Sequence, residues 1–359
     1  MTKNRILILS GGYDPYGLGG ITLLYNSLFK YFPKAVERYY SQTSRKSNPI
    51  KFLWNRLIGN SLQLRRKLIE CKPDLVVLNT SLKAGFYSVI PELIICRHYA
   101  KKIVLFNHGW DINSEYMLSS FLGKFILKRA DAMFVLSCSF KQKLNKLPHA
   151  PKSVYVLTTT VDDELLDGFD ISLRNGKIKN FLFLARMEKY KGIIETIDTF
   201  DLLQRKHPDI QLRMVGSGSG LEEAKQHVIE KNIRNVTFPG LLKGEDVTNE
   251  YKNADFFFLL SYSEGMPSSV LEAMSFGLPV ATRPVGGVPD IFQDGINGVL
   301  SDSLDPQFYA SRIEKLMDDE QTTYNMQIGN YQYGQNTFKA SKVSAKMMGI
   351  FNEIINNNK

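Results

Sequence analysis

Two successive series of short apolar runs, separated by helical stretches, constrain the fold of this chain more than any other feature. In the first half, five runs rich in Val, Ile, Leu and Phe are predicted strands: Arg5–Ser10, Asp74–Leu78, Ile103–Asn107, Ala132–Leu136 and Val154–Leu157. They show little alternation of apolar and polar residues, which indicates parallel strands covered by helices on both faces. The predicted helices between them are Ile21–Tyr31, Leu53–Glu70 and Ser139–Lys146.

The second half repeats this pattern. Its predicted strands are Phe181–Leu184, Gln211–Val215, Val236–Phe238, Asp255–Leu260 and Pro279–Ala281. Its predicted helices are Gly192–Lys206, Leu221–Glu230, Ser268–Phe276 and about Pro306–Met317. A break that contains Gly and Asn is expected next, and Lys342–Ile355 is predicted to be the last helix.

Alternating strands and helices predict parallel α/β sheets, and a length of 359 residues suits two domains. Residues 158–179 are rich in Thr, Asp, Gly and Asn, which is typical of an interdomain connection. We therefore predict two Rossmann-like domains, at 1–165 and 166–337, with a C-terminal helix at about 338–359 that packs back onto the first. Ligands are expected at the carboxyl ends of the strands, in a central cleft that both sheets face.

Composition excludes several other classes of protein. No run approaches the roughly 18 apolar residues that a membrane span needs. The three cysteines, Cys71, Cys96 and Cys138, are far apart and form no CxxC pair, so we expect free thiols in a reducing compartment and no structural zinc. These features predict a cytoplasmic protein. The basic residues form no recognised nucleic-acid module, so we expect no nucleic-acid partner.

A predicted strand–turn–helix segment at residues 261–274 holds the most candidate functional residues. Gly265 and Pro267 shape its turn, and Ser268 or Ser269 is expected to cap the helix that follows. Backbone N–H groups at the start of that helix would form a natural anion site.

Two glutamates flank the turn. Glu264 lies in it, and Glu272 lies about one turn inside the helix. An ionised carboxylate accepts bidentate hydrogen bonds, so this pair can hold two sets of sugar hydroxyls. The alternative is one surface glutamate and one that stabilises a helix N-terminus.

The spacing of Glu264 and Glu272 resembles the E-x7-E signature of retaining glycosyltransferases of family 4, the glycosyl transferases group 1. These enzymes have the GT-B fold, with two Rossmann-like domains. The resemblance covers essentially the whole chain and is sharpest in the second half. There it includes Pro279-Val280-Ala281-Thr282, Gly286-Gly287-Val288-Pro289-Asp290 and Asp294-Gly295-Ile296-Asn297-Gly298.

The resemblance implies a role for each residue of this segment. Glu264 would contact the donor sugar, and Glu272 would contact the ribose hydroxyls of the nucleotide. The backbone of the turn would hold sugar and phosphate oxygens, through Gly265, Met266, Pro267, Ser268 and Ser269.

Positive charge comes from a second strand-to-helix turn, which Arg186 and Lys191 bracket. A donor diphosphate needs cations to neutralise the charge that builds on the leaving nucleotide. The segment resembles the family's G-R-x…K-G element, with Ala185 in place of the usual Gly, and this implies that both cations are catalytic. The alternative is a loop with solvated basic residues.

Glycine-rich turns follow a strand in each half. Gly19 and Gly20 precede the first predicted helix, where the absence of side chains lets the backbone approach a ligand. By resemblance they lie beside the diphosphate or acceptor, Gly216 and Gly218 contact the donor, and Leu242 lies where backbone groups meet the base. Neither turn is a Walker motif or a complete G-x-G-x-x-G, which argues against a nicotinamide-dependent oxidoreductase.

His108 is a further candidate, because it lies at the carboxyl end of a predicted strand. A lone histidine is more often structural, but this position matches a His site of the family, which implies a contact with the donor sugar. Asp111 is expected to orient His108 or the acceptor. The linker departs from the family, because residues 159–162 read Thr-Thr-Val-Asp in place of Asn-Gly-Val-Asp, which predicts a stiffer hinge.

Together these features predict a retaining glycosyltransferase that moves a sugar from a nucleotide-sugar donor to an acceptor. The expected pathway is the synthesis of a cell-surface glycan: lipopolysaccharide, capsule or exopolysaccharide. The resemblance implies no metal requirement, and no other cofactor is expected. Two alternatives stay open: a sugar-nucleotide epimerase or phosphorylase on a similar fold, and a non-catalytic protein that binds sugar nucleotides.

The net charge of +9 is uneven, because the first half is strongly basic and the second is acidic. Much of the positive charge lies at Arg45, Lys46, Lys51, Arg56, Arg65, Arg66 and Lys67, with apolar residues between them. A helix of this kind suits an anionic membrane surface, so we predict a glycan or lipid-linked acceptor and peripheral attachment to the inner face of the cell membrane. The alternative is an ordinary amphipathic helix whose Lys and Arg stems cover its own sheet.

Overall fold

The computed structural model describes residues 4–10, 20–40, 60–82, 86–110 and 113–357. The chain divides into two compact units, one formed by residues 1–159 with 340–359 and the other by residues 160–339. The predicted domain boundaries lie a few residues from these. Each unit is described by itself, and the expected cleft between them stays a prediction.

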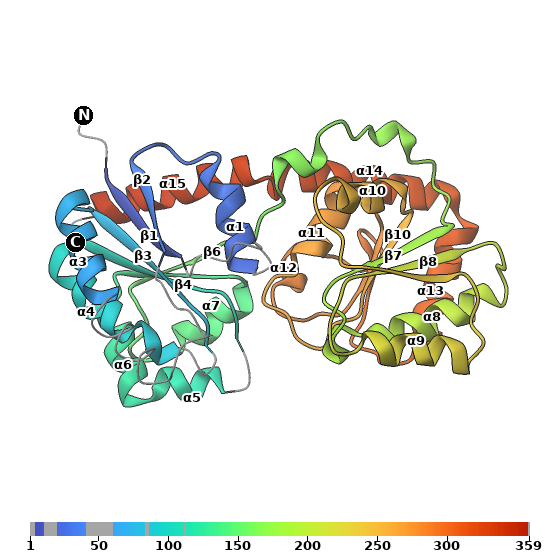
Figure 1. Cartoon of the computed structure of the whole chain (residues 1–359), viewed down its shortest axis with the longest axis horizontal. Helices are drawn as coiled ribbons and strands as arrows, with labels where there is room; N and C mark the ends of the chain where they lie inside the picture. Colours follow the sequence, from blue (N-terminus) through green and yellow to red (C-terminus); the bar gives the residue numbers. More distant parts are fainter. Residues whose placement is uncertain (1–3, 11–19, 41–59, 83–85, 111–112, 358–359) are drawn as a thin grey trace. The chain divides into compact units, whose positions relative to one another are not determined.

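The first unit is built on a parallel sheet of six strands in the order β2-β1-β3-β4-β5-β6 (Figure 1). The strands are β1 (Ile6–Ser10), β2 (Val36–Tyr40), β3 (Leu75–Thr80), β4 (Lys102–Asn107), β5 (Ala132–Val135) and β6 (Ser153–Val156). Strand β2 was not predicted. It lies at the edge of the sheet and buries only Val36, so its sequence lacks the apolar run that marked the other strands.

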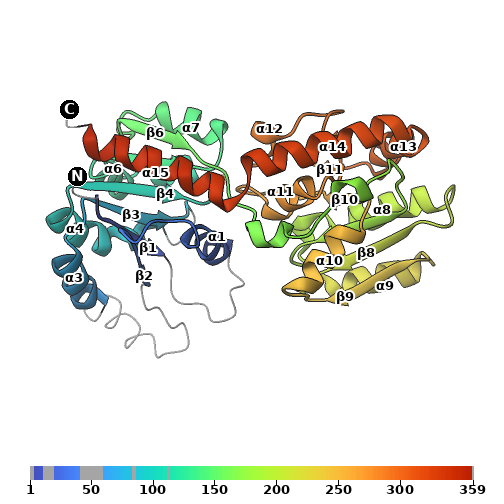
Figure 2. The same ribbon diagram turned by 90° about the horizontal axis from the view of Figure 1, so that it is seen from above.

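Helices surround this sheet: α1 (Gly20–Phe29), α3 (Asn60–Cys71), α4 (Ile90–Tyr99), α5 (Ser114–Ser119), α6 (Phe121–Leu127), α7 (Cys138–Asn145) and α15 (Ala340–Asn356), with a 3₁₀ turn η2 (Phe86–Val89). The last helix, red in Figures 1 and 2, lies with the strands of this unit. Phe351 of α15 stacks on Phe134 of β5 with 5.7 Å between ring centroids. Of the predicted helix Leu53–Glu70, residues 53–59 lie outside the described residues.

The second unit has its own parallel sheet of six strands, in the order β12-β11-β10-β7-β8-β9. The strands are β7 (Asn180–Leu184), β8 (Gln211–Val215), β9 (Val236–Gly240), β10 (Phe256–Leu259), β11 (Val280–Thr282) and β12 (Gly298–Leu300). From β7 the chain runs to β8 and β9 on one side and then to β10, β11 and β12 on the other. The strand order therefore reverses between β7 and β10, where ligands bind in open α/β sheets.

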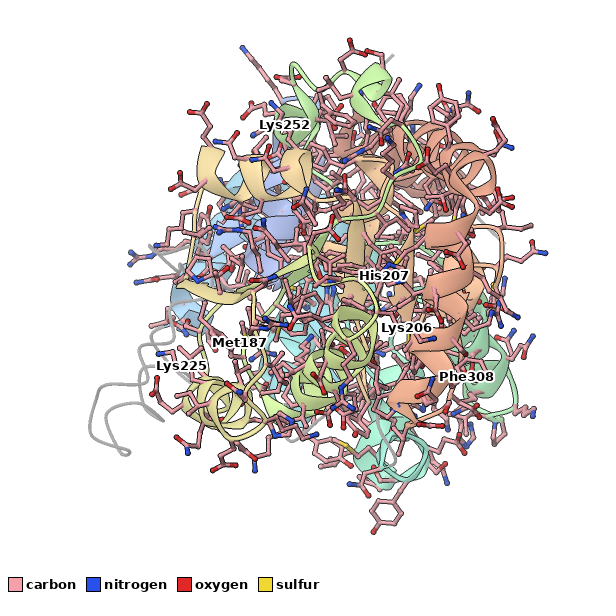
Figure 3. All side chains as sticks on the ribbon, turned by 90° about the vertical axis from the view of Figure 1, so that its right-hand side faces the viewer. Met187, Lys206, His207, Lys225, Lys252 and Phe308 are labelled. Carbon is pink, nitrogen blue, oxygen red and sulfur yellow. The ribbon has the colours of Figure 1, made fainter. Side chains whose placement is uncertain are left out.

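The helices of this unit are α8 (Ile193–Gln204), α9 (Leu221–Glu230), α10 (Glu245–Asn253), α11 (Ser268–Ser275), α12 (Val288–Ile291), α13 (Pro306–Asp318) and α14 (Glu320–Thr337), with 3₁₀ turns η3 (Asp163–Leu166), η4 (Ile171–Leu173) and η5 (Lys189–Lys191). Helix α13 packs along α8. Lys206, which follows α8 and is labelled in Figure 3, donates to Glu314 of α13 at 2.8 Å.

Helix α14 corrects the break expected after Met317. Asn330 is fully buried inside this helix, and its amide donates to the carbonyl oxygens of Leu278 and Asn297, both at 2.9 Å. Gly334 lies against Ser275, where a Cβ would come within 2.6 Å of the Ser275 Cα. The Asn and Gly that favoured a break are therefore used for tertiary packing, which overrides their low helix propensity.

A buried arginine fixes the connecting segment of the second unit. Arg174 is 5% exposed and donates to the carbonyl oxygens of Tyr251, Ala254 and Phe276. Burial lowers the pKa of Arg174 to about 10, so it stays charged at neutral pH. It satisfies three carbonyls near the ends of α10 and α11 and so positions the start of the unit against them.

None of the helices in the described part of the chain is long and apolar enough to cross a membrane. The cysteines of this part, Cys71, Cys96 and Cys138, form no disulfide bond with one another.

Candidate functional site

The carboxyl edge of the second sheet brings together residues from the loops after β7 and β10. Lys191 follows β7 and Glu264 follows β10, and the distance from Lys191 Nζ to Glu264 Oε1 is 2.6 Å. Their side chains are only 12% and 10% exposed. This ion pair lies at the point where the strand order reverses, so two predicted site residues far apart in the sequence meet there.

A glycine makes this approach possible. Gly192 has a φ of 72° and caps the start of α8. A Cβ on Gly192 would lie 2.3 Å from the Leu260 carbonyl oxygen, so no other residue fits without moving the backbone. Next to it, the Tyr262 N–H donates to the Tyr190 carbonyl at 2.8 Å. The loops therefore pack backbone against backbone, which places Lys191 beside Glu264.

The loop after β11 packs against the same turn. Gly286 has a φ of 58°, and a Cβ there would lie 2.3 Å from the Glu264 carbonyl oxygen and 2.4 Å from that of Gly265. The Gly287 N–H donates to the Gly265 carbonyl at 2.7 Å. Close backbone packing thus fixes the turn that carries Glu264 on both sides.

The start of α11 has no side-chain cap. Pro267 is the N-cap residue, and Ser268 and Ser269 are the first residues inside the helix. The expectation that one of these serines caps the helix is therefore wrong, because both lie one or two positions too late. The Val270 N–H donates to the Pro267 carbonyl at 3.1 Å, and the N–H groups of Ser268 and Ser269 before it remain available to an anionic ligand. They lie beside Gly265 and the buried Met266.

Glu272 is held from behind by a buried tyrosine. The Tyr251 hydroxyl donates to Glu272 Oε2 at 2.6 Å, and Tyr251 is fully buried and stacked on Phe276. Burial raises the pKa of Glu272, and the bond from Tyr251 partly offsets that rise. Glu272 is therefore not an exposed carboxylate at a helix terminus, and its Oε1 forms no hydrogen bond with a described residue.

Arg186 is exposed and donates to the Tyr190 hydroxyl at 2.6 Å. The loop that carries it rests on the two predicted glycines after β8. A Cβ on Gly216 would lie 1.9 Å from the Ala185 carbonyl oxygen, and one on Gly218 would lie 2.4 Å from that of Met187. These glycines therefore have a packing role next to Arg186. Leu242 follows β9 at the far edge of the sheet.

Two residues near the site were not predicted from the sequence. Tyr251 is a buried residue of α10, a polar helix that was not predicted from the sequence. Arg283 follows β11, its guanidinium lies 4.9 Å from the Tyr262 ring centroid, and it donates to the Asp302 carbonyl. Its buried Nε has no partner among the described residues. A single arginine after a short strand carried no motif that would have identified it.

In the first unit, His108 lies at the carboxyl end of β4 and contacts Asn79 of β3. The distance from His108 Nε2 to Asn79 Oδ1 is 2.6 Å, and the Tyr25 hydroxyl donates to the same oxygen at 2.7 Å. Asn79 Nδ2 donates to the Leu9 carbonyl at 2.7 Å, which fixes the orientation of the amide. His108 Nε2 must then be the donor, which leaves Nδ1 as an acceptor.

Burial lowers the pKa of His108 to about 3, so the imidazole is neutral at physiological pH. Gly20 begins α1, and no described atom lies within 4 Å of a Cβ placed there. Gly19 and Asp111 lie outside the described residues. Among the residues described, no cluster of three or more His, Cys, Asp or Glu side chains is placed to hold a metal ion.

Comparison with known proteins relates this chain to one family. The family model described as "Glycosyl transferases group 1" matches residues 168–335. The sulfoquinovosyl transferase SQD2 of Arabidopsis thaliana is 30% identical, over 90% of this chain and 68% of that protein. The D-inositol 3-phosphate glycosyltransferase of Corynebacterium diphtheriae is 28% identical over 49% of this chain, and the match spans only 42% of that relative's length.

The fold has close counterparts among solved structures. The structure of Alr3699/HepE from Anabaena in complex with UDP and glucose superposes with a TM-score of 0.74. The match covers 98% of this chain and 100% of that one, at 18% sequence identity. Two parallel sheets of six strands in one chain are thus a known arrangement.

Proposed function

This chain belongs to the group 1 glycosyl transferases and has the predicted GT-B fold, and from this premise we propose that it is a retaining glycosyltransferase. In this proposal it moves a sugar from a nucleotide-sugar donor to an acceptor in the synthesis of a cell-surface glycan. The observation that carries the proposal is the Lys191–Glu264 pair at the strand-order reversal, beside the uncapped start of α11.

The second unit supplies the donor site in this proposal. Lys191, Arg186 and the N–H groups at the start of α11 neutralise the diphosphate as the nucleotide leaves. The free oxygen of Glu272 accepts hydrogen bonds from the ribose hydroxyls, and Glu264 accepts them from the sugar. The Anabaena protein, solved with UDP and glucose, supports a nucleotide and a sugar as the ligand class.

The first unit contributes His108 as a neutral hydrogen-bond acceptor through Nδ1, and not as a cation or an acid. For the transfer itself we propose attack on the face from which the nucleotide leaves. The acceptor oxygen bonds to the anomeric carbon as the bond from that carbon to the diphosphate breaks. The acceptor proton passes to the departing phosphate oxygen. No protein nucleophile is needed, and catalysis rests on positioning and charge stabilisation.

Acceptor dependence tests this proposal against the alternatives. Nucleotide-sugars that raise the melting temperature identify the donor, because a ligand that binds only the native state stabilises it. We expect release of nucleoside diphosphate from that donor only when an acceptor glycan is added. Conversion of the donor without an acceptor would identify an epimerase, and binding without any turnover would identify a non-catalytic protein.

Charge neutralisation by side chains leads to a prediction about metals. We expect full activity in the presence of EDTA, because Arg186 and Lys191 supply the positive charge that a metal ion supplies in other transferases. The measurement is the initial rate after dialysis against the chelator, with and without added Mg²⁺ or Mn²⁺. An absolute requirement for either ion would refute this part of the proposal.

The shifted pKa of His108 predicts a pH dependence of stability. The pKa of His108 is about 6.5 in the unfolded chain and falls to about 3 on folding. The contribution of this shift to the free energy of unfolding is therefore fully present at pH values above the unfolded pKa. That contribution is lost as the pH falls from 6.5 toward 3. The His108→Gln variant should therefore lose less stability than the parent between pH 7 and pH 5, measured by denaturant unfolding. Equal losses would contradict a neutral, buried His108.

We also propose that the acceptor is membrane-associated, which the outer face of α3 supports. This helix buries Leu64 and Leu68 against its own unit, as the alternative of a packed amphipathic helix expects. Its outer face exposes Leu62 (54%) and Ile69 (47%). Arg65 donates to the Tyr99 hydroxyl on that side of the unit.

Vesicle binding tests the role of this face. We expect binding that increases with anionic lipid and decreases with salt, and that weakens when Arg65 and Arg66 become Gln. Lys67 matters less, because it pairs with Glu37 at 2.5 Å. Cosedimentation measures the bound fraction, and Lys141→Gln/Lys146→Gln is the matched control. Absence of binding to anionic vesicles at low salt would refute the membrane proposal alone.

A further inference from the structure

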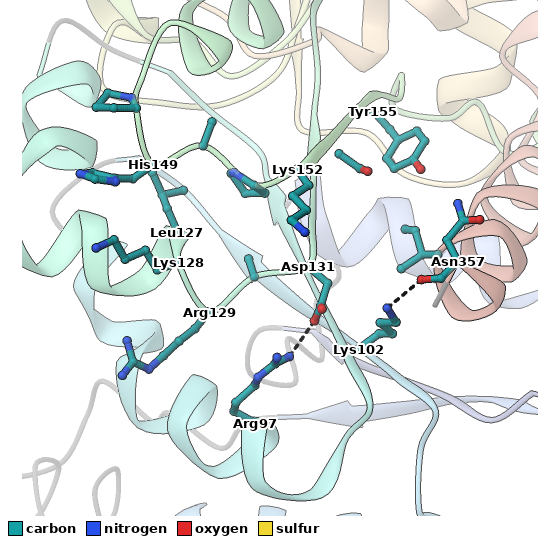
Figure 4. A pocket seen from close by; sticks show the side chains of 16 residues that line it. Arg97, Lys102, Leu127, Lys128, Arg129, Asp131, His149, Lys152, Tyr155 and Asn357 are labelled. Carbon is teal, nitrogen blue, oxygen red and sulfur yellow. Dashed lines mark hydrogen bonds and ion pairs between the residues drawn. The ribbon is translucent and has the colours of Figure 1, made fainter. Parts of the chain in front are cut away.

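A cavity of about 430 Å³ lies in the first unit, beside the amino ends of its strands (Figure 4). His108 lies at their carboxyl ends. The lining of the cavity includes Lys102, the first residue of β4, Asp131, which precedes β5, and Ser153, the first residue of β6. His108 follows the other end of β4, and a strand of this length spans about 20 Å. The cavity is therefore separate from the residues proposed for the transfer reaction.

The lining of the cavity is strongly basic. Its Lys and Arg side chains are Arg97, Lys102, Lys128, Arg129 and Lys152. Its one carboxylate, Asp131, is already satisfied, because it accepts from Arg97 NH1 at 2.7 Å and from the Ile103 N–H at 2.8 Å. The other four cations form no ion pair with any residue in the described ranges, and His149 adds a further polar group.

Two of the four cations are held in place by the fold. Lys102 Nζ donates to the Asn357 carbonyl at 3.0 Å, just beyond the end of α15. Arg129 lies over the Phe125 ring, 3.6 Å from its centroid, and donates to the Phe125 carbonyl. Lys128 and Lys152 have no hydrogen-bond partner among the described residues. The cavity thus combines fixed positive charge with two free ammonium groups.

We propose that this cavity binds a phosphate-bearing ligand. Several cations around one concave site match the multiple acceptor oxygens of a phosphate group, and hydrogen bonds between charged partners are the strong ones. The volume falls in the range of small-molecule sites, about 300–1,000 Å³, so the phosphate belongs to a larger molecule. The source of the phosphate is either a soluble compound or a phospholipid headgroup.

The neighbouring helix gives a reason to test both sources. Leu127 and Lys128, at the end of α6, line the cavity. The start of the same helix exposes Phe121 (82%) and Leu122 (41%). Exposed apolar residues next to a basic cavity suit the boundary between the headgroups and the acyl chains of a membrane.

Protection of lysines from acylation provides a residue-level test. The full-length protein is treated with an amine-reactive ester, and the labelling rate of each lysine is read by peptide mass spectrometry. The probes are pyrophosphate, vesicles of phosphatidylcholine, and vesicles of phosphatidylcholine with phosphatidylglycerol. We expect Lys128 and Lys152 to be labelled about tenfold more slowly once a binding probe exceeds its dissociation constant tenfold. Lys141 and Lys146, outside the cavity on the same unit, should be unaffected.

The pattern of protection identifies the ligand. Protection by pyrophosphate indicates a soluble ligand, and protection only by vesicles with phosphatidylglycerol indicates a lipid headgroup. In either case Lys128→Gln/Lys152→Gln should abolish the protection of Lys102, the remaining lysine of the cavity, whereas Lys141→Gln/Lys146→Gln should not. No protection by any probe, or equal protection of Lys141 and Lys146, overturns the proposal. Labelling of Lys191 reports pyrophosphate at the second unit separately.

Discussion

Replacing Lys191 with Met should lower kcat/KM for the nucleotide-sugar donor by a hundredfold or more. In the proposed reaction the variant loses charge-assisted hydrogen bonds to the diphosphate, each worth about 1.5–3 kcal/mol, which should strengthen as the nucleotide leaves. It also leaves the Glu264 carboxylate, only 10% exposed, without its partner at 2.6 Å. Steady-state kinetics measures the loss.

Measurements of nucleotide binding distinguish the role of Lys191 from that of Glu264. Glu264→Gln keeps Lys191 for the diphosphate, so nucleoside diphosphate should still bind while turnover falls. Lys191→Met should lose both nucleotide binding and turnover. The matched control is Lys189→Met, because Lys189 lies in the same 3₁₀ turn and pairs with Glu223 on the surface instead. Full activity of Lys191→Met, or an equal loss in Lys189→Met, would show that the assignment is wrong.

Replacing Glu272 with Ala should produce the second large effect, a loss of tenfold to a hundredfold in kcat/KM. This change removes the proposed acceptor for the ribose hydroxyls and leaves the buried Tyr251 hydroxyl unpaired, which costs about 1–3 kcal/mol. Binding of nucleoside diphosphate, measured by calorimetry, should fall in parallel. Unchanged nucleotide affinity would place the ribose elsewhere.

Tyr251→Phe tests whether Tyr251 positions Glu272. Burial already raises the pKa of Glu272, and the bond from Tyr251 lowers it. Without that bond the carboxyl should protonate at a higher pH, so the acidic limb of the pH profile of kcat/KM should move upward. Tyr309→Phe is the matched control, since that buried hydroxyl donates to the Ser301 carbonyl instead. A shift of the same size in the control would leave Tyr251 a merely structural role.

The sequence predicted best those features that depend on one local pattern. Buried parallel strands give continuous apolar runs, so ten of the twelve strands were expected close to their observed positions. The two exceptions have physical reasons. Strand β2 buries only Val36, and β12 has three residues that pair in register with Val280 of β11 and the two residues after it. Neither has enough apolar sequence to be recognised.

The residues of the candidate site also differ in whether a local sequence pattern reveals them. Glu264, Lys191 and His108 were identifiable because each lies in a recognisable local motif after a predicted strand, and the carboxyl ends of parallel strands share one edge. Tyr251 and Arg283 were not, because their importance depends on partners distant in sequence, Glu272 and Tyr262. A pattern along the chain carries no information on such contacts.

The glycine contacts at the carboxyl edge of the second sheet restrict how this site can change over evolutionary time. Added Cβ atoms at Gly192, Gly216 and Gly286 would lie 1.9–2.3 Å from carbonyl oxygens of neighbouring loops, so the backbone of one loop cannot change at these points without displacing another. A new donor preference must therefore arise from side-chain replacements on a fixed backbone. Loop grafts between relatives would be tolerated only when several loops are transferred together.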